Sequence, residues 1–533
     1  MKAGALRMGI LLNPSNIDFS RAVNSEIYID KSELINYTNS VIDTEQRFIC
    51  VSRPRRFGKS MAANMLTAYY SNGCDSRELF APYKIAGRAS FEKHLNKYNV
   101  IHINMVKYLS EAKDVEEMLR FIGEDIIGDI TDNMPGLVMP RRVNVINVLD
   151  KAFQQFGTPF VFIIDEWDCV FRKKKIDTDS QTAYLDFLRN LLKDQSYVAL
   201  AYMTGILPIK KYGEHSAINM FTEISMTDPR EYSEVTGFTE AEVSELCQKY
   251  NMPFEETKRW YDGYNLRGVS IYNPRSVVMS MTGGYFNNYW TSTETYEALK
   301  EHIQRNFDGL KEKVTKMIAG ESVPVNTAKF QNDMTSLNSA DDVLTLLVHL
   351  GYLTFRATNE TGYGEVWIPN SEVRQEFINS IEDGGWENLM KAINDSDKLL
   401  EATLNGDAET VAALVERSHS ENTSVLQYND ENSLACVISL AYYTAQNKYI
   451  IHRELPTGKG FADVVFIPRK HIDLPAIIVE LKHNKTSGAA IEQIKQKKYT
   501  EKIAQFTGEI LLVGINYDDD KGHTCEIEKF TKE

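Results

Sequence analysis

The sequence lacks several features that mark particular classes of protein. No two of its six cysteines stand at C-x-x-C spacing, so a structural zinc site is not expected. No apolar stretch reaches the roughly 18 residues that a membrane helix needs, and the short apolar run near the start has no cleavage pattern of a signal peptide. Internal repeats and low-complexity tracts are also missing. We therefore expect a cytoplasmic globular protein whose scattered cysteines are small buried residues.

Positive charge is in deficit as well. The 59 Lys and Arg residues face 74 Asp and Glu residues, which gives a net charge of −15. This balance argues against a protein that coats nucleic acid nonspecifically, although a local basic cleft stays compatible with it. The candidate basic clusters are Arg53 with Arg55 and Arg56, Arg172–Lys175, and Lys495–Lys498. For Arg172–Lys175 we favour a solvated face.

Apolar runs and helical stretches alternate through the first 200 residues. Strands are expected at Arg47–Val51, Asn99–Met105, Phe160–Ile164 and Val198–Met203, with a helix at Met61–Tyr70 directly after the first. Continuous apolar strands between helices are typical of a parallel sheet that is buried on both faces. The sequence therefore predicts an α/β layer in this part of the chain.

The pattern changes after about residue 230. Residues 230–320 read as mostly helical. They are followed by a helix at Val343–Leu350, strands at Tyr352–Phe355 and Val366–Ile368, and a helix at Ser371–Ile381. Helix, hairpin and helix in this order have the shape of a winged-helix module, which could bind nucleic acid or serve only as a packing spacer.

The loop between the first strand and its helix reads Arg53–Ser60, RPRRFGKS. In a P-loop, backbone N–H groups converge on phosphates, a lysine reaches the outer phosphates and the next Ser or Thr ligates magnesium. Here Lys59 and Ser60 stand at those positions, while Arg53 replaces the usual first glycine. The residues expected to contact ATP are Arg53, Pro54, Arg55, Arg56, Phe57, Gly58, Lys59 and Ser60. Taken alone, the short GKS motif is weak evidence.

A second acidic element strengthens the P-loop interpretation. Asp165 and Glu166 follow the apolar strand Phe160–Ile164, where Asp165 can hold Mg²⁺ through water and Glu166 can polarise the attacking water. The competing interpretation is a helix N-cap followed by a favourable first-turn acid. Thr204 after the fourth strand could sense the γ-phosphate or simply form a turn. For an arginine finger, Arg55, Arg56 and Arg230 are candidates, and none can be assigned.

SRPRRFGKS, FVFIIDEWD and YMTGILPI together resemble the AAA-ATPase-like family of bacterial proteins, in which the loop typically carries arginines. Further similar motifs are WYDGY at 260–264, YNP at 272–274, GYLT at 351–354 and IPN at 368–370. The resemblance spans nearly the whole chain. It implies an ATPase followed by a C-terminal nuclease-superfamily domain of the PD-(D/E)XK type. For Asp262 and Asn273 we favour turn formation.

The C-terminal residues support that implication. Asp463 lies in one expected strand, Ala462–Ile467, while Glu480 and Lys482 are two residues apart in the next and so share a face. Carboxylates of this kind, here Asp463 and Glu480, hold Mg²⁺ for phosphodiester hydrolysis, and a nearby lysine can orient the water. D-x₁₆-E-x-K is a permissive pattern, because polar residues alternate on any half-exposed strand.

Two further residues are candidates for this second site. Glu431, at the start of the helix expected at Glu431–Thr444, resembles the helical glutamate of some superfamily members. Gln493 resembles their supporting helix residue and lies in the helix expected at Ala489–Gln505, with Lys497 and Tyr499 near it. Strands are also expected at Tyr449–Arg453, Ala476–Leu481 and Ile510–Asn516, and a linker helix at Glu401–Asn422.

These observations predict an α/β protein of several domains. The segments are a P-loop AAA-like ATPase domain (1–230), a helical lid region (231–330), a winged-helix-like module (331–400), a linker helix (401–425) and a restriction-endonuclease-like domain (426–533). We expect an ATPase, with ATP and Mg²⁺, coupled to a nuclease that acts on DNA or RNA. The alternatives are an ATP-dependent regulatory switch whose nuclease-like domain binds without cutting, and an assembly protein in which nucleotide controls homo-oligomer formation.

Overall fold

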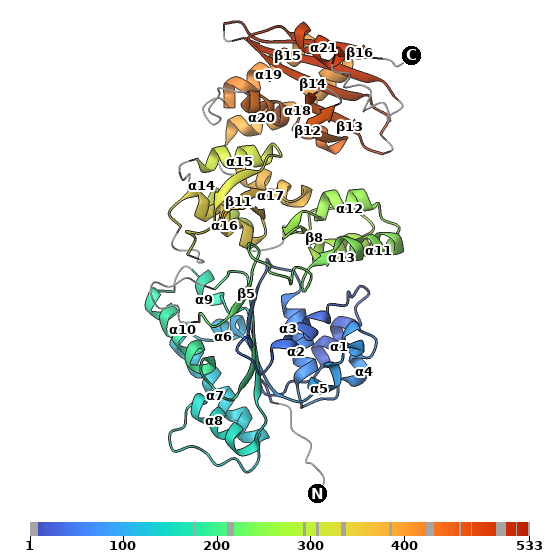
Figure 1. Ribbon diagram of the computed structural model, residues 1–533. Helices are drawn as coiled ribbons and strands as arrows, with labels where there is room; N and C mark the ends of the chain where they lie inside the picture. Colours follow the sequence, from blue (N-terminus) through green and yellow to red (C-terminus); the bar gives the residue numbers. More distant parts are fainter. Residues whose placement is uncertain are drawn as a thin grey trace. The chain divides into compact units, whose positions relative to one another are not determined.

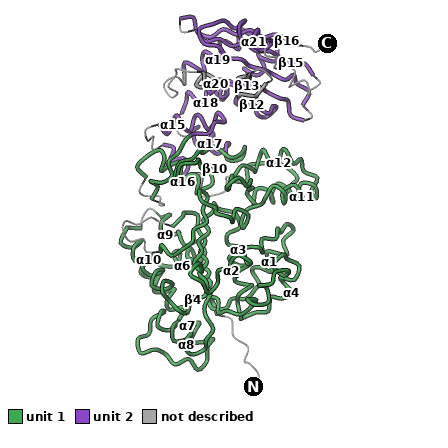
Figure 2. Tube along the Cα trace, in the orientation of Figure 1, with its two compact units in different colours: residues 1–295, 324–373 green, residues 296–323, 374–533 purple. Residues whose placement is uncertain are grey.

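The computed structural model describes residues 9–173, 176–209, 218–290, 295–304, 307, 309–331, 337–382, 386–422, 431–457, 460–470, 472–496, 508–518 and 520–530. The chain forms two compact units (Figure 2). The first comprises Met1–Thr295 and Pro324–Val373, and the second comprises Tyr296–Val323 and Arg374–Glu533. The finer division into five segments stays a prediction.

A five-stranded parallel sheet forms the centre of the first unit. Its strands lie in the order β2-β3-β4-β1-β5. Their bounds are β1 (Phe48–Ser52), β2 (Asn99–Asn104), β3 (Phe160–Asp165), β4 (Val198–Gly205) and β5 (Thr222–Ile224). Every residue of β1, β3 and β4 is buried, which explains their continuous apolar runs. The first four strands confirm the predicted α/β layer, whereas the short β5 was not predicted.

Helices cover both faces of this sheet (Figure 1). On one face lie α1 (Ile17–Val23), α2 (Glu33–Val41), α3 (Lys59–Tyr70), α4 (Arg77–Phe80) and α5 (Phe91–His94), with the 3₁₀ turn Lys84–Gly87. On the other face lie α6 (Met105–Glu111), α7 (Val115–Asn133), α8 (Val145–Phe156), α9 (Cys169–Arg172) and α10 (Thr178–Leu192). Side-chain caps set the starts of several of them, as at Asp114, whose carboxylate accepts from Glu117 N at 2.8 Å.

The rest of the first unit is less helical than predicted. It contains α11 (Glu240–Tyr250), α12 (Phe254–Tyr261) and α13 (Pro274–Gly283), but also a small sheet in the order β6-β8-β7. These strands are β6 (Phe238–Thr239), β7 (Tyr264–Leu266) and β8 (Val269–Tyr272). The prediction of a mostly helical stretch missed this sheet because its strands span only two to four residues.

The predicted helix, hairpin and helix are present further along the chain. They are α16 (Ala340–Leu350), β10 (Thr354–Ala357), β11 (Tyr363–Trp367) and α17 (Ser371–Glu382), and β9 (Val323–Asn326) adds a third strand beside β11. We call residues 324–373, which belong to the first unit, the hairpin module. The chain passes from the first unit to the second within α17.

The second unit is a mixed sheet with helices on both faces. Its strands are β12 (Tyr449–Thr457), β13 (Gly460–Pro468), β14 (Ala476–His483), β15 (Ile510–Asp518) and β16 (Gly522–Phe530), in sequence order, with β14 and β15 parallel. Its helices are α14 (Thr295–Gln304), α15 (Leu310–Ile318), α18 (Glu387–Asn405), α19 (Ala408–Asn422), α20 (Glu431–Ala441), the 3₁₀ turn Tyr443–Asn447 and α21 (Ser487–Gln496).

Two apolar cores flank the sheet of the second unit. One includes residues of α18, α19 and α20, and the other includes Ile491 and Ile494 of α21. The expected single linker helix is two helices, because the chain breaks at Gly406, whose φ is +75°. The last strand, β16, was not predicted, and residues 497–505 of the expected last helix lie outside the described residues.

Two of the exclusions made from the sequence can be compared with the structure. Within the described ranges, no helix combines the length and the apolar character needed to cross a membrane. Of the cysteines, Cys50, Cys169, Cys247 and Cys436 are buried as expected, whereas Cys74 and Cys525 are partly exposed.

Candidate active sites

The loop between β1 and α3 has the backbone shape of a phosphate-binding loop. Two residues adopt left-handed conformations, Arg56 with a φ of +67° and Gly58 with a φ of +83°. Gly58 is also the N-cap of α3, so the free N–H groups of the first helical turn border this loop. A non-glycine residue in this conformation is strained, and such strain is concentrated at functional sites. The predicted strand, loop and helix are therefore all in place.

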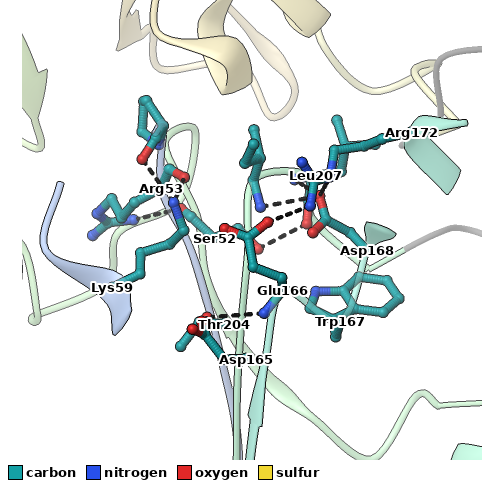
Figure 3. Close-up of polar contacts among 12 residues, drawn as sticks. Ser52, Arg53, Lys59, Asp165, Glu166, Trp167, Asp168, Arg172, Thr204 and Leu207 are labelled. Carbon is teal, nitrogen blue, oxygen red and sulfur yellow. Dashed lines mark hydrogen bonds and ion pairs between the residues drawn. The ribbon is translucent and has the colours of Figure 1, made fainter. Parts of the chain in front are cut away.

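Arg53 shows why the usual first glycine is dispensable here. Its backbone is not left-handed, and its N–H donates to Gly205 O at 3.0 Å. Its guanidinium is fully buried and donates from Nη1 to Ser52 O and Ile224 O, both at 3.1 Å (Figure 3). Burial lowers the pKa of Arg53 to about 10. The side chain thus ties the loop to β5, and a direct contact of Arg53 with phosphate stays a prediction.

Lys59 is buried at the start of α3, with 5% of its surface exposed. Its Nζ donates to Arg53 O at 3.0 Å and to Pro54 O at 2.8 Å (Figure 3). Burial lowers the pKa of its ammonium, and the carboxylates Glu166, Asp168 and Asp165 oppose that shift. The lysine is therefore held by neutral carbonyls, which an anionic phosphate oxygen can replace with a stronger bond, because both partners would then be charged.

The acidic pair lies at the end of β3, beside the loop. Asp165 is buried and accepts a hydrogen bond from Thr204 Oγ1, so Thr204 holds this carboxylate and its predicted role as a phosphate sensor stays a prediction. Glu166 has a left-handed backbone with a φ of +59°, and its N–H lies 3.4 Å from Thr204 Oγ1. Its carboxylate forms an ion pair with Arg172 (Figure 3).

Arg172 contradicts the expectation of a solvated face. Only 13% of its side chain is exposed, and its Nε lies 3.3 Å from Asp168 Oδ2 in addition to the ion pair with Glu166. Asp168 in turn accepts from the N–H groups of Ile206 and Leu207 at 3.0 and 2.9 Å. Arg172 therefore connects Glu166 to the turn after β4. The sequence did not reveal this role, because Arg172 begins a run of basic residues of which the next, Lys173, is indeed exposed.

A cavity of about 490 Å³ opens on the loop. Arg55 to Ala62 and Glu166 form one part of its wall, and Ser60 on the lining is exposed. Another part is apolar and includes Ile27 and Phe238. The cavity thus combines the start of α3, including Lys59 and Ser60, with an apolar wall.

Arg275 also lines this cavity, and sequence reasoning missed it. It lies in the first turn of α13, whose N-cap is Asn273, with Oδ1 accepting from Arg275 N at 2.9 Å. The Asn-Pro pair at 273–274 is a recognisable helix start and could have placed Arg275 at a helix terminus. Asn273 is the N-cap of α13 directly after β8, rather than part of the turn between helices that was expected. Asp262 bonds Ser270, and its carbonyl accepts from Asn370 Nδ2 at 2.8 Å.

The second constellation lies in the C-terminal half of β14. Glu480 is 1% exposed and Lys482 is 7% exposed, and Lys482 Nζ donates to Glu480 Oε1 at 2.9 Å. Gln493 of α21 donates from Nε2 to the same oxygen. The structure therefore brings together three of the predicted residues on the α21 face of the sheet.

A glycine lets α21 approach this face closely. Gly514 of β15 lies opposite Glu480, and a Cβ at this position would lie 2.4 Å from Ser487 O. Any side chain there would push the start of α21 away, so the reach of Gln493 to Glu480 depends on this glycine. This close approach is a feature that the sequence pattern alone did not reveal.

The remaining predicted residues of this site are placed only by their backbone. Asp463 lies in β13 directly before Val464, which pairs with Val479, and Glu480 directly follows Val479. The antiparallel register thus brings the two acidic positions next to each other. Glu431 is the first residue of α20. The side chains of Asp463 and Glu431, like residues 497–499, lie outside the described residues.

Comparison with known families decides what these two regions are. Residues 17–213 match the family described as predicted AAA-ATPase, and residues 429–527 match the PD-(D/E)XK nuclease superfamily. The chain carries an AAA-ATPase-like domain and a C-terminal PD-(D/E)XK nuclease-superfamily domain. The first match contains the P-loop and the acidic pair, and the second contains Glu480, Lys482 and Gln493.

Individual similar proteins add no function to these assignments. An uncharacterized protein in the vnfD 5′ region of Azotobacter chroococcum mcd 1 is 24% identical over 516 residues, 92% of this chain and 93% of its own length. Among solved structures, the Walker-type ATPase paby2304 of Pyrococcus abyssi covers 65% of this chain and 94% of its own, at 13% identity and a TM-score of 0.34. The Aeropyrum pernix ORC2 protein covers 68% and 98%, at 11% identity and a TM-score of 0.31. Scores this low support no conclusion, so the assignment rests on the family matches.

Within the AAA-ATPase-like domain, the arginine-rich loop is divided between two tasks. Gly58, Lys59 and Ser60 lie at the cavity, whereas Arg53 supports the loop from the sheet side. In the nuclease-superfamily domain, the acid, the lysine and the helical glutamine already contact one another. Both arrangements depend on side chains that meet only after folding.

Proposed function

We propose that the AAA-ATPase-like domain binds and hydrolyses ATP, and that ATP controls metal-dependent phosphodiester cleavage of nucleic acid by the C-terminal domain. The observation that carries this proposal is the buried contact of Lys482 and Gln493 with Glu480, beside the position of Asp463. A buried carboxylate that meets a lysine in the middle of a strand costs desolvation energy, and groups of this kind are typical of catalytic sites.

At the P-loop, the residues present fit ATP with Mg²⁺. The free N–H groups at the start of α3 and the Lys59 ammonium would bind the phosphates, and the apolar wall would receive the base. Ser60 and, through water, Asp165 would hold Mg²⁺, which would neutralise developing charge on the phosphates. Glu166 would take the proton of the attacking water. Arg275 would contact the outer phosphates from α13.

In the C-terminal domain, the donor set fits an oxygen-liganded cation such as Mg²⁺. No group of three His, Cys, Asp or Glu side chains able to hold a metal occurs among the described residues, to which the side chains of Asp463 and Glu431 do not belong. Glu480 and Asp463 would hold the cation, which would lower the pKa of a bound water and stabilise developing charge. Lys482 would orient that water, and Gln493 would fix the Glu480 carboxylate.

One observation favours the alternative of a regulatory switch that binds nucleic acid without cutting it. Glu480 Oε1 already accepts hydrogen bonds from both Lys482 and Gln493. A cation would have to compete with the Lys482 ammonium for this carboxylate. If the Lys482 ammonium stays bound to the Glu480 carboxylate, no cation would bind there. The domain would then keep its fold and could bind nucleic acid but would not cleave it.

A cleavage assay distinguishes the two. The full-length protein is incubated with single- and double-stranded DNA and RNA, with Mg²⁺ or Mn²⁺, and with or without ATP. We expect the wild type to cleave and Asp463→Ala to abolish cleavage. Lys59→Ala should change the cleavage rate only under conditions in which ATP alters the rate of the wild type. Binding without any cleavage, under every metal and nucleic acid, would support the switch instead. Sizing the protein with and without ATP tests the third alternative, nucleotide-controlled assembly.

A further inference from the structure

Three side chains of the P-loop contact parts of the first unit that lie beyond the ATPase family match. Pro54 lies against Gly351, Arg56 donates from Nη1 to Tyr289 O at 3.1 Å, and Phe57 packs edge-on against Tyr264, with ring centroids 5.0 Å apart. Each contact comes from a residue between the first position of the loop and Gly58. The loop therefore has a second set of neighbours besides the phosphate cavity.

The contact of Pro54 with Gly351 is close and depends on glycine. Gly351 caps α16 with a φ of +87°, and a Cβ there would lie 2.7 Å from Pro54 Cβ and 2.9 Å from the Trp290 ring. The Gly351 carbonyl accepts from Tyr264 Oη at 2.8 Å, and Tyr264 is the residue that packs on Phe57. Two separate contacts thus join the loop to the end of α16, in the hairpin module.

Arg56 reaches the other end of the hairpin module through Tyr289. The N–H of Tyr289 donates to Glu372 Oε1 at 2.7 Å, and Ser276 Oγ of α13 donates to the same oxygen at 2.9 Å. Glu372 is fully buried in the first turn of α17. A chain of hydrogen bonds therefore runs from Arg56 through the backbone C=O and N–H of Tyr289 to Glu372 in α17.

Arg56 is also exposed to the contents of the nucleotide site, because it lines the cavity. Burial lowers the pKa of its guanidinium, and Arg275 and Arg55 add to this while Glu372 opposes it. A phosphate group would therefore relieve the repulsion among these cations. Its bond to Arg56 would be stronger than the present bond to a neutral carbonyl, because both partners would then be charged. Arg56 thus lies between two acceptors, the Tyr289 carbonyl that it now contacts and a phosphate in the cavity.

We propose that Arg56 transmits the occupancy of the phosphate site to the hairpin module by exchanging the Tyr289 carbonyl for a nucleotide phosphate. Pro54 and Phe57 hold the loop against α16, so that the exchange loosens the Tyr289 end of the contact and leaves the Gly351 end in place. This makes Arg56 a positioning residue with a role outside phosphate binding itself. The inference rests on the proposed binding of ATP at the P-loop.

Hydrogen–deuterium exchange of the full-length protein tests this inference. ATP with Mg²⁺ is added at a concentration that saturates binding, which is measured separately by titration. In the wild type we expect amides in residues 285–290 to exchange about fivefold faster with ATP, as loss of one hydrogen bond predicts. Residues 351–357 are expected to change little. In Arg56→Ala, residues 285–290 should exchange fast without ATP, and saturating ATP should add no further change.

Two further variants keep the test decisive. Glu372→Gln leaves every cavity residue in place but weakens the acceptor for Tyr289 N, so the segment 285–290 should exchange faster in both states. Tyr264→Phe removes only the hydroxyl that donates to Gly351 O, so exchange should rise at 351–357 while the ATP response at 285–290 persists. Lys59→Ala should abolish the response together with binding.

Each outcome bears on a different claim. Saturable ATP binding without a change at 285–290 in the wild type would overturn the inference and leave the proposed function intact. An ATP response that persists in Arg56→Ala would also overturn it. Absence of ATP binding to the wild type would overturn both the inference and the ATPase proposal.

Discussion

The two candidate sites of this protein are built from opposite kinds of backbone. At the P-loop site, the groups come from a loop in which Arg56 and Gly58 have left-handed φ angles and from the end of β3, where Glu166 also has one. In the C-terminal domain, Glu480 and Lys482 lie within a regular strand, and Gln493 lies in a regular helix. The first site therefore depends on local strain and the second on register and packing. Substitutions at the two sites should therefore differ in whether they change activity, ligand binding or stability.

The lysines of the two sites differ in the same way. Lys59 donates to two neutral carbonyls, so its charge is not yet neutralised by a direct partner. Lys482 already contacts the Glu480 carboxylate. A nucleotide would thus supply an anion for Lys59 at the first site. At the second site, a metal cation would have to displace the Lys482 ammonium from Glu480. We expect the P-loop lysine to control ligand binding and the strand lysine to control stability as well as activity.

The largest expected effect is on ATP hydrolysis. Glu166→Gln should lower kcat by about 10²–10⁴ while ATP binding is retained, because the amide cannot accept the proton of the attacking water. Phosphate release and a nucleotide titration measure the two quantities. Asp194→Asn is a matched control, since Asp194 also has a left-handed backbone, with a φ of +58°, but is exposed. A similar loss in Asp194→Asn would show that the effect is not specific to the Glu166 carboxylate.

The second effect concerns stability. Lys482→Met should lower the free energy of unfolding by about 3 kcal/mol, because it leaves a buried carboxylate without its cation. Lys529→Met provides the control, since its ion pair with Glu509 is exposed and should contribute less than about 1 kcal/mol. Chemical denaturation monitored in the C-terminal domain measures both. Similar values for the two variants would mean that Glu480 finds other partners and that the buried pair is not what distinguishes this site.

The smallest effect is a pH dependence confined to the second unit. His523 Nδ1 lies 2.7 Å from Glu416, and the rings of His419, Tyr517 and His523 pack together. Burial lowers the pKa of His419 to about 4, and it also lowers the pKa of His523. Both rings stay neutral in the folded state, while the unfolded chain binds protons below about pH 6.5.

The sign of this dependence follows from linkage. Stability from these rings is complete above about pH 6.5 and is lost as the pH falls towards about 4, because protons bind the unfolded state first. Denaturation midpoints of the second unit at pH 7 and pH 5 test this. His419→Phe keeps a ring at the position but cannot titrate, so it should flatten the profile. A profile that stays equally steep would exclude His419 as its source.

The sequence indicated much of the fold where burial leaves a strong pattern. Strands such as β3 and β4 are buried along their whole length, so their apolar runs are unambiguous. By contrast, β16 alternates charged and apolar residues at a sheet edge, and β6 spans two residues. Neither length nor periodicity separates such strands from loops. One helix was predicted at 401–422, but the chain breaks at Gly406. The break was missed because the residues on both sides of this glycine have helical patterns.

The sites show a similar limit. Two residues on one strand, Glu480 and Lys482, must share a face, and this could be predicted from spacing alone. The partners of Arg53 and Arg172 could not, because a long flexible side chain can reach either side of its backbone. Arg53 turned into the sheet and Arg172 turned to Glu166, and each choice depends on carbonyls or carboxylates that are distant in sequence or brought near only by folding.

The order of the central sheet has a consequence for synthesis of the chain. β1 carries the P-loop, and its hydrogen-bonded neighbours are β4 and β5, which come much later in the sequence than the loop itself. Until the ribosome has made residues 198–224, β1 has neither of the strands with which it pairs in the sheet. ATP in the cell can therefore act as a folding ligand only late in translation, after β2 and β3 have already emerged from the ribosome.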